Sequence, residues 1–380
     1  MTPPPAADSL PEITIPEGLK PSDGRFGCGP SKVRPEAIEA LVADAPTYMG
    51  TSHRQPTVKF MVARLRNAVA ELFAAPDGYE VLLGNGGTTG FWDAATFGLI
   101  ENKSQHLDFG EFSSKFAKAA KAAPFLDEPQ VIESATGTHP VAVAADDVDF
   151  YALTHNETST GVMMPIVRPA GATGLVGVDA TSGAGGLRVD LAETDVYYFA
   201  PQKCLAADGG LWIAVCSPAA IERIEQIEAS GRWIPASIDL STALENSRKD
   251  QTYNTPALAT IHLAVSQLEW LNNNGGLEFA ASRCDRSAEI MYGWAEKTDY
   301  TTPFVTNPDE RSHVVATIDF DDAINASMVS KVLRANGIVD TEAYRKLGRN
   351  QVRIGMFPAI EPDDVAALTD CIEHVVTALG

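Results

Sequence analysis

Apolar residues follow a helical spacing near the N-terminus and form short continuous runs further along the chain. Between Val58 and Ala75 they recur with a period of about 3.6 residues, which predicts an amphipathic helix. A shorter helix is expected from Pro35 to Ala43. The continuous runs predict strands at residues 80–83, 131–133, 151–154, 175–178, 196–200 and 211–216.

Helical or loop stretches separate several of these runs, which favours an α/β fold with a mostly parallel sheet flanked by helices. The last two runs can also form an antiparallel hairpin. A long helix is expected to start with Thr255 as its N-cap and Pro256 as its first helical residue, and to end near Asn273. After it, helices at residues 277–297, 326–336 and 362–379 alternate with strands near 314–318 and 352–355, which is typical of a smaller α+β domain.

These patterns predict three parts. Residues 1–24 form a tail or arm whose first ten residues are loose, residues 25–270 a large ligand-binding domain, and residues 271–380 a small C-terminal domain. The first part of the large domain is also able to pack with the small one.

Composition narrows the choice of partners. The chain has 29 basic and 50 acidic residues and a formal net charge of −21, so its average field repels a nucleic-acid backbone. A small anionic substrate remains possible, because it needs only a few well-placed arginines. The five cysteines are odd in number and without a CxxC pair, which argues against a disulfide framework or a zinc site and favours a reducing cytoplasm. We expect neither a membrane span nor a signal peptide.

One lysine stands out because of its surroundings. Lys203 follows the apolar run at residues 196–200 and precedes a turn that ends at Gly209 and Gly210. Aromatic and small neighbours remove water from its ammonium group, which lowers the pKa of the lysine and makes the neutral amine more accessible. A neutral amine can form an imine with an aldehyde. The alternative is an ordinary lysine whose stem packs on Tyr198 while its head reaches water.

Other candidate groups also follow predicted strands. Asp179 ends the run at residues 175–178 and could pair with a protonated ring nitrogen, or simply cap a turn. The glycines between Gly84 and Gly90 precede a predicted helix and could cradle a phosphate. The same glycines suggest an alternative, a nicotinamide-dependent oxidoreductase, whose dinucleotide-binding fingerprint also needs an acidic residue after the next strand. Asp108 is the candidate for that residue, but the third glycine stands one place late for GxGxxG. Ligands of such sheets bind at the carboxyl ends of the strands, so these groups could converge.

Four motifs in order resemble one enzyme family. They are His155-Asn156-Glu157-Thr158-Ser159-Thr160-Gly161, Asp179-Ala180-Thr181-Ser182, Ala200-Pro201-Gln202-Lys203 and Tyr253-Asn254-Thr255-Pro256. Together they resemble the phosphoserine aminotransferases, most closely the actinobacterial branch, which have the aspartate-aminotransferase fold type. The resemblance runs from about Arg25 to the C-terminus.

The resemblance implies a pyridoxal-phosphate-dependent transaminase of L-serine biosynthesis. It would exchange an amino group between O-phospho-L-serine or 3-phosphohydroxypyruvate and glutamate or 2-oxoglutarate, through a lysine aldimine of pyridoxal 5′-phosphate. The family also implies a homodimer. Whether the phosphorylated hydroxythreonine of pyridoxine biosynthesis is a substrate too stays open.

The resemblance also assigns roles to residues that bind the cofactor. Lys203 would carry pyridoxal phosphate and move the proton at the substrate Cα, and Asp179 would pair with the ring nitrogen. Thr158 would bind the ring hydroxyl and Phe112 would stack on the ring, where the family often has Trp. The cofactor phosphate would meet Thr88, Thr89 and Gln202, together with Asn254 and Thr255 of the partner chain. In other members an arginine follows the glycines, where this chain has Thr89.

Substrate binding falls by the same resemblance on arginines and one histidine. Arg353 would bind the substrate carboxylate, and His53 with Arg54 its other anionic end. Arg345 or Arg349 would hold the substrate phosphate, and the sequence does not choose between them. Each of these arginines could instead form a surface ion pair.

Other functions remain as alternatives. They are another small-molecule pyridoxal-phosphate transaminase, a cysteine desulfurase using Cys204 or Cys216, the oxidoreductase and a non-catalytic binding module. Both cysteines are also explained as small buried apolar residues.

Overall fold

The computed structural model describes residues 10–380, so the expected loose tail lies outside the described residues except for Leu10. Its main feature is a seven-stranded sheet in the order β1-β9-β8-β7-β4-β2-β3. The strands are β1 (Glu80–Asn85), β2 (Ser104–Asp108), β3 (Gln130–Glu133), β4 (Phe150–Thr154), β7 (Leu175–Asp179), β8 (Val196–Phe199) and β9 (Leu211–Cys216). Only β9 runs antiparallel to its neighbours, β1 and β8. The mostly parallel α/β sheet is confirmed, including the hairpin-like pairing of the last two runs.

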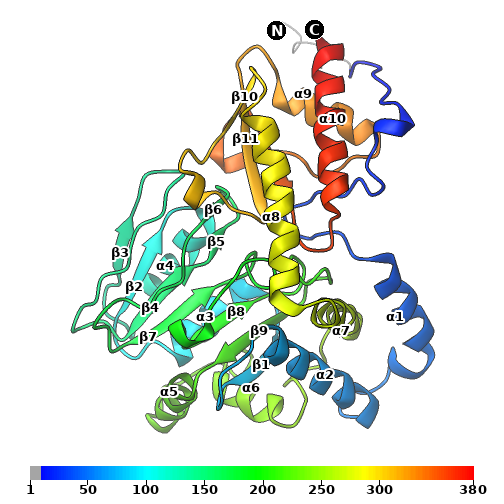
Figure 1. The fold of residues 1–380 in the computed structure, drawn as a ribbon. Coiled ribbons are helices and arrows are strands. Elements are labelled where there is room, and N and C mark those ends of the chain that lie inside the picture. Colours follow the sequence, from blue (N-terminus) through cyan, green and yellow to red (C-terminus); the bar gives the residue numbers. More distant parts are fainter. Residues whose placement is uncertain (1–9) are drawn as a thin grey trace, which may run out of the picture.

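Both faces of this sheet are covered by helices, as Figure 1 shows. Along β8, Tyr197 and Phe199 pack with α2 (Pro56–Leu72) and α7 (Leu258–Asn273), whereas Val196 and Tyr198 point to the opposite face. That face carries α3 (Thr88–Gly98), α4 (Glu111–Ala122), α5 (Pro218–Ala229) and α6 (Leu240–Ser247). Because both faces are buried, the strand is a continuous apolar run rather than an alternating one.

Most predicted elements are present, with three informative differences. The helix α1 (Pro35–Tyr48) is longer than expected. The predicted start of α7 was wrong, since the helix begins at Leu258 after Ala257, and Thr255 instead bonds to His53 through its side chain and to Asn85 through its carbonyl. Strand β2 escaped prediction because it buries polar residues, among them Gln105, whose amide bonds to Gln130 and to the Val143 carbonyl.

The C-terminal part builds a second core. A three-stranded antiparallel sheet of β10 (Thr301–Pro303), β11 (Val315–Phe320) and β12 (Gln351–Gly355) packs with α8 (Gly276–Ala295), α9 (Ala326–Ala335) and α10 (Pro362–Leu379). In Figure 1, α8 runs from the large sheet region up to this part. Ile15 and Phe26 are buried in the same core. The N-terminal arm therefore packs with the small C-terminal part, while the domain boundaries remain predictions.

Short elements complete the chain. They are β5 (Asn156–Glu157), β6 (Val162–Met163) and the 3-10 helices η1 (Glu17–Leu19), η2 (Leu191–Glu193), η3 (Pro308–Glu310) and η4 (Arg345–Leu347). All five cysteines are free and buried. Within residues 10–380, no helix has the length and apolar character needed to cross a membrane.

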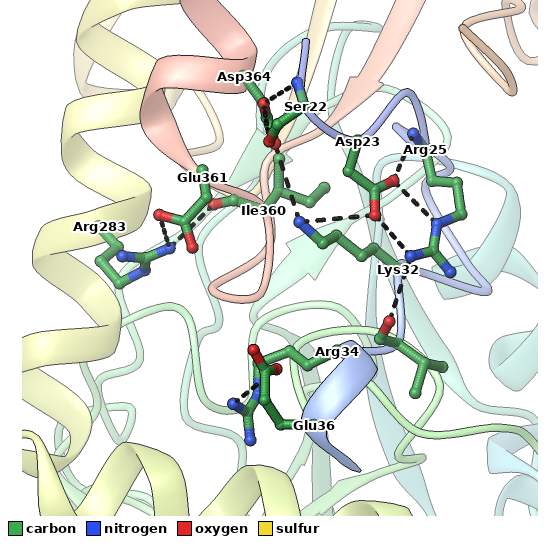
Figure 2. A network of polar contacts seen from close by, with 11 residues as sticks. Ser22, Asp23, Arg25, Lys32, Arg34, Glu36, Arg283, Ile360, Glu361 and Asp364 are labelled. Atoms are coloured by element: carbon green, nitrogen blue, oxygen red, sulfur yellow. Dashed lines mark hydrogen bonds and ion pairs between the residues drawn. The ribbon is translucent and has the colours of Figure 1, made fainter. Parts of the chain in front are cut away.

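A polar network fastens the arm to the start of α10. Figure 2 shows Lys32 pointing between Asp23 and Asp364, with its Nζ 3.7 Å and 3.8 Å from their carboxylates. Asp364, in the first turn of α10, also accepts hydrogen bonds from the backbone N–H and hydroxyl of Ser22, at 2.6 Å and 2.7 Å. One residue before Lys32, the N–H of Ser31 donates to the Gln202 carbonyl at 2.8 Å. The arm is thus held both by the small core and by the turn that carries Lys203.

Candidate active site

A cavity of about 340 Å³ lies at the carboxyl ends of the parallel strands. Its walls come from the loops after β4, β7 and β8, from the N-terminal ends of α3 and α4, from the arm and from the C-terminal part. Of the residues proposed from the sequence, these line it: Thr88, Thr89, Phe112, Thr158, Asp179, Gln202, Lys203 and Arg353.

Lys203 is the central side chain of the cavity and is only 7% exposed. Its Nζ donates to Thr158 Oγ1 at 2.9 Å and lies 5.3 Å from the centre of the Phe112 ring. Burial lowers the pKa of Lys203, and the nearby Asp179 carboxylate only partly opposes this. The geometry favours the buried, reactive amine over a lysine whose head reaches water.

Asp179 is the last residue of β7 and is nearly buried. Its Oδ1 accepts from the N–H and hydroxyl of Thr181, at 2.9 Å and 2.5 Å. Its Oδ2 accepts from the indole N–H of Trp92, at 2.9 Å. Burial raises the pKa of Asp179, while these hydrogen bonds and Lys203 act in the opposite direction.

A buried glutamate positions Phe112. Glu157 Oε2 accepts from the N–H groups of Phe112 and Ser113, at 3.1 Å and 3.0 Å, and its Oε1 from the N–H and hydroxyl of Ser159. A carboxylate at a helix N-terminus is stabilised by the free N–H groups and by the helix dipole. Glu157 therefore fixes the first turn of α4, and with it the Phe112 ring, against the loop that carries Thr158.

The N-terminal end of α3 forms another part of the cavity wall. Thr88 and Thr89 are its first two residues, and free backbone N–H groups at a helix N-terminus are a ready site for a phosphate. Gln202 adds a side-chain amide whose buried oxygen has no hydrogen-bond partner within the described part of the chain.

Arg353, on β12, approaches the cavity from the C-terminal part. One guanidinium nitrogen donates to the Thr158 carbonyl at 3.2 Å, and the group lies 5.2 Å from the centre of the Tyr344 ring. Its buried Nε has no partner among residues 10–380, and no carboxylate of that range pairs with it. An arginine held by a carbonyl and a ring, with donors left over, is suited to bind an anion.

Four predicted residues gather elsewhere. Thr255 Oγ1 lies 3.2 Å from His53 Nδ1, and Arg54 donates to Gln251 at 2.6 Å. Asn254 and Thr255 are exposed, and none of the four lines the cavity of its own chain. The cluster contacts the end of β1, which leads into α3, through Asn85, whose amide donates to the Thr255 carbonyl at 3.0 Å.

The two candidate phosphate arginines differ in their surroundings. Arg349 pairs with Asp319, and its guanidinium also lies over the Phe304 ring. Arg345 is exposed at the start of η4, next to Tyr344, and forms no ion pair within residues 10–380. Neither arginine lines the cavity.

Several lining residues were not singled out from the sequence: Cys28, Gly29, Trp92, Thr154, Asn156, Thr181 and Tyr344. Asn156 and Thr181 stand inside motifs that were noticed, so proximity to Thr158 and Asp179 was an available signal. Trp92 stands one helical turn after Thr88, so the helical spacing was the signal there, whereas Gly29 gave none, because it reaches the cavity only through the packing of distant segments.

The lining fits pyridoxal phosphate, the cofactor implied by the resemblance. It combines a buried amine, a buried carboxylate, a helix N-terminus and an aromatic ring. Within the described residues, Asn156 Oδ1, Gln202 Oε1 and Arg353 Nε are buried without hydrogen-bond partners, so the cavity offers polar groups to a ligand.

Comparison with known proteins agrees with this geometry. The family model described as aminotransferase class-V matches residues 115–343. A phosphoserine aminotransferase of Nocardioides is 61% identical over 97% of this chain and 99% of its own length. A putative phosphoserine aminotransferase of Mycobacterium leprae is 60% identical over 98% of this chain and its own full length (100%).

Solved structures agree in fold. A phosphoserine aminotransferase of Cytophaga hutchinsonii has a TM-score of 0.85 at 23% identity, over 92% of this chain and 99% of that one. A pyridoxamine-pyruvate aminotransferase of Mesorhizobium loti has a TM-score of 0.81 at 19% identity, over 96% and 94%. The oxidoreductase alternative finds no support in these relatives. The chain belongs to the phosphoserine aminotransferases, pyridoxal-phosphate-dependent enzymes of aminotransferase class V.

Proposed function

We propose that this chain transfers the amino group of O-phospho-L-serine to 2-oxoglutarate, and the reverse, with Lys203 as the base and Asp179, Thr158 and Phe112 around the cofactor ring. The observation that carries the assignment is the convergence of Lys203, Asp179 and Arg353 on one cavity, although they lie on three separate strands or loops. The expected pathway is L-serine biosynthesis.

Pyridoxal phosphate, when bound, supplies an electrophilic carbonyl carbon and a ring that stores the electron pair released at the substrate Cα. Lys203 is buried, and its lowered pKa increases the fraction of neutral amine that can take up a proton at that carbon. Asp179 keeps a negative charge next to the ring nitrogen. Thr158 and Phe112 orient the ring, and the first residues of α3 bind the phosphate together with Gln202.

Substrate recognition follows from the arginines. We assign the substrate carboxylate to Arg353, whose guanidinium is oriented by Tyr344 and the Thr158 carbonyl. For the substrate phosphate we propose Arg345 rather than Arg349, because Asp319 already neutralises Arg349.

Steady-state kinetics with phosphoserine and with unphosphorylated serine tests the substrate assignment. We expect kcat/KM for serine to be lower by about 100-fold or more, since each charged hydrogen bond contributes about 1.5–3 kcal/mol. Equal values would refute phosphate recognition. Arg345→Ala should raise KM for phosphoserine more than KM for glutamate, and Arg349→Ala is its matched control. The same assay with phosphohydroxythreonine tests a role in pyridoxine biosynthesis.

We also propose that the enzyme is a homodimer in which His53, Arg54, Asn254 and Thr255 complete the partner's cavity. Their grouping outside the cavity of their own chain, with Arg54, Asn254 and Thr255 exposed, supports this arrangement. Exposed apolar side chains flank the same loop, with Met49 41% and Phe60 65% exposed.

Hybrid dimers provide the test of sharing. One chain would carry Lys203→Ala and the other Arg54→Ala, each inactive or impaired alone. If Arg54 serves the partner, the hybrid contains one site with both native residues, and activity returns. If Arg54 serves its own chain, the hybrid stays as impaired as its parents, which would rule out sharing. Sedimentation gives the oligomeric state independently.

We propose a cytoplasmic location as well. The five free, buried cysteines fit a reducing compartment, where thiols are kept unpaired. Fractionation of cells that express the tagged chain is the corresponding measurement.

A further inference from the structure

The indole of Trp92 bonds to a residue proposed to bind the cofactor, from a helix that the sequence linked only to phosphate. Trp92 Nε1 donates to Asp179 Oδ2 at 2.9 Å, and both side chains are buried, 4% and 6% exposed. Thr181 bonds to the other oxygen of the same carboxylate through its N–H and hydroxyl. Each oxygen of the Asp179 carboxylate therefore accepts at least one hydrogen bond, Oδ2 from Trp92 and Oδ1 from Thr181.

Helix α3 contributes more than the proposed phosphate site to the cavity wall. Thr88 opens this helix, and Trp92 stands four residues later, so both side chains lie on the same face. Both residues line the cavity: Thr88 belongs to the proposed phosphate site, and Trp92 donates to Asp179. A single helix thus carries both the proposed phosphate site and the donor to the Asp179 carboxylate.

The ring of Trp92 is itself held in place. It stacks on Phe116 of α4, with ring centroids 6.4 Å apart and planes 13° apart. Helix α4 also carries Phe112, whose ring borders the lysine. The indole N–H is therefore aimed at Asp179 by the helix that supplies the stacking ring, which is what an oriented hydrogen bond to a charged group requires.

We propose that Trp92 and Thr181 are positioning residues that hold the Asp179 carboxylate in the orientation that pairs with the nitrogen of the cofactor ring. Through Asp179 they would set how tightly the cofactor is held and how fast the chemical step runs. This inference rests on the proposed role of Asp179.

Trp92→Phe tests the proposal, because it removes the donor and keeps an aromatic ring against Phe116. The measured quantities are the dissociation constant of pyridoxal phosphate, from titration of the cofactor-free protein by absorbance, and kcat and KM of the loaded enzyme. We expect cofactor binding to weaken by about 10- to 100-fold, the order expected for one charged hydrogen bond, and kcat to fall with little change in KM for either substrate.

Trp294→Phe is the matched control. Trp294 is also buried, 8% exposed, and its indole N–H donates to Glu373 at 3.0 Å, but in the C-terminal core. It should change stability and leave cofactor affinity within about twofold. If Trp294→Phe lowers affinity as much as Trp92→Phe, the effect is general destabilisation and the proposal is wrong.

A double-mutant cycle with Asp179→Asn separates positioning from packing. If Trp92 acts through Asp179, adding Trp92→Phe to Asp179→Asn costs no further affinity. If the two losses multiply, Trp92 acts by packing and the proposal is overturned. Should Trp92→Phe not fold, Thr181→Ala enters the same cycle with the same two outcomes. If Asp179→Asn alone changes neither affinity nor kcat, the proposed role of Asp179 fails first. If Asp179→Asn is impaired while Trp92→Phe and Thr181→Ala are not, only the present inference fails.

Discussion

The arm loop at Gly29 offers a sharp test of how the lysine is placed. A Cβ built at Gly29 would lie 2.6 Å from Lys203 Cε and 3.2 Å and 3.3 Å from its Cγ and Cδ. Contacts below about 3 Å are not tolerated, and the φ of Gly29 is +128°, a region that residues with a side chain rarely adopt. Gly29→Ala therefore forces either the loop or the lysine to move.

The expected cost has two parts. Adopting positive φ costs about 1–2 kcal/mol for a residue with a Cβ, and inserting a methyl group into a packed interior about 1–3 kcal/mol. The sum is a loss of roughly 2–5 kcal/mol in the free energy of unfolding. A displacement of the lysine amine by about 1 Å would also lower kcat by about 100-fold.

Chemical denaturation of the cofactor-free protein and titration with pyridoxal phosphate measure the two effects. Gly293→Ala is the control, because that position lies inside α8 with open space around its Cβ and should gain about 0.5–1 kcal/mol. If the free energy of unfolding of Gly29→Ala lies within about 0.5 kcal/mol of the parent value and the variant binds the cofactor equally well, the steric reasoning is refuted.

Further predictions concern three buried charged groups. Glu157→Gln leaves at least one backbone N–H, that of Ser159 or Phe112, without an acceptor. The free energy of unfolding should fall by about 1–3 kcal/mol. An unchanged midpoint in urea denaturation would contradict this. Burial lowers the pKa of Lys203 from its ordinary value of 10.5, and only the neutral amine attacks an aldehyde. The rate of pyridoxal phosphate uptake should therefore reach half its maximum below pH 10.5. A midpoint at or above that pH argues against burial of the amine in solution. Lys32→Met leaves Asp23 and Asp364 without their shared cation and should cost roughly 2–4 kcal/mol in the free energy of unfolding. Thermal unfolding measures this loss, and a Lys32→Met variant as stable as the parent would exclude the electrostatic explanation.

Much of the fold was readable from local patterns. The run at residues 211–216 coincides with β9, and the helix predicted at residues 362–379 coincides with α10. Burial on both faces makes a strand continuously apolar, and that signal lies within the segment itself. Strand β2 lacks this signal, because it buries polar residues. Distant partners satisfy their hydrogen bonds, and a local pattern does not reveal those partners.

The site likewise contains residues that the sequence indicates and residues that only tertiary packing brings in. Sequence alone determined the groups that follow strands, Lys203 and Asp179, because strand ends are set by local apolar runs and parallel strands bring their carboxyl ends to one edge of the sheet. Only the tertiary structure decided what surrounds them. Trp92 meets Asp179 across 87 positions, and Gly29 borders Lys203 because the arm is fastened to α10. Such contacts depend on how separate elements pack, and packing is a property of the folded chain rather than of any one segment.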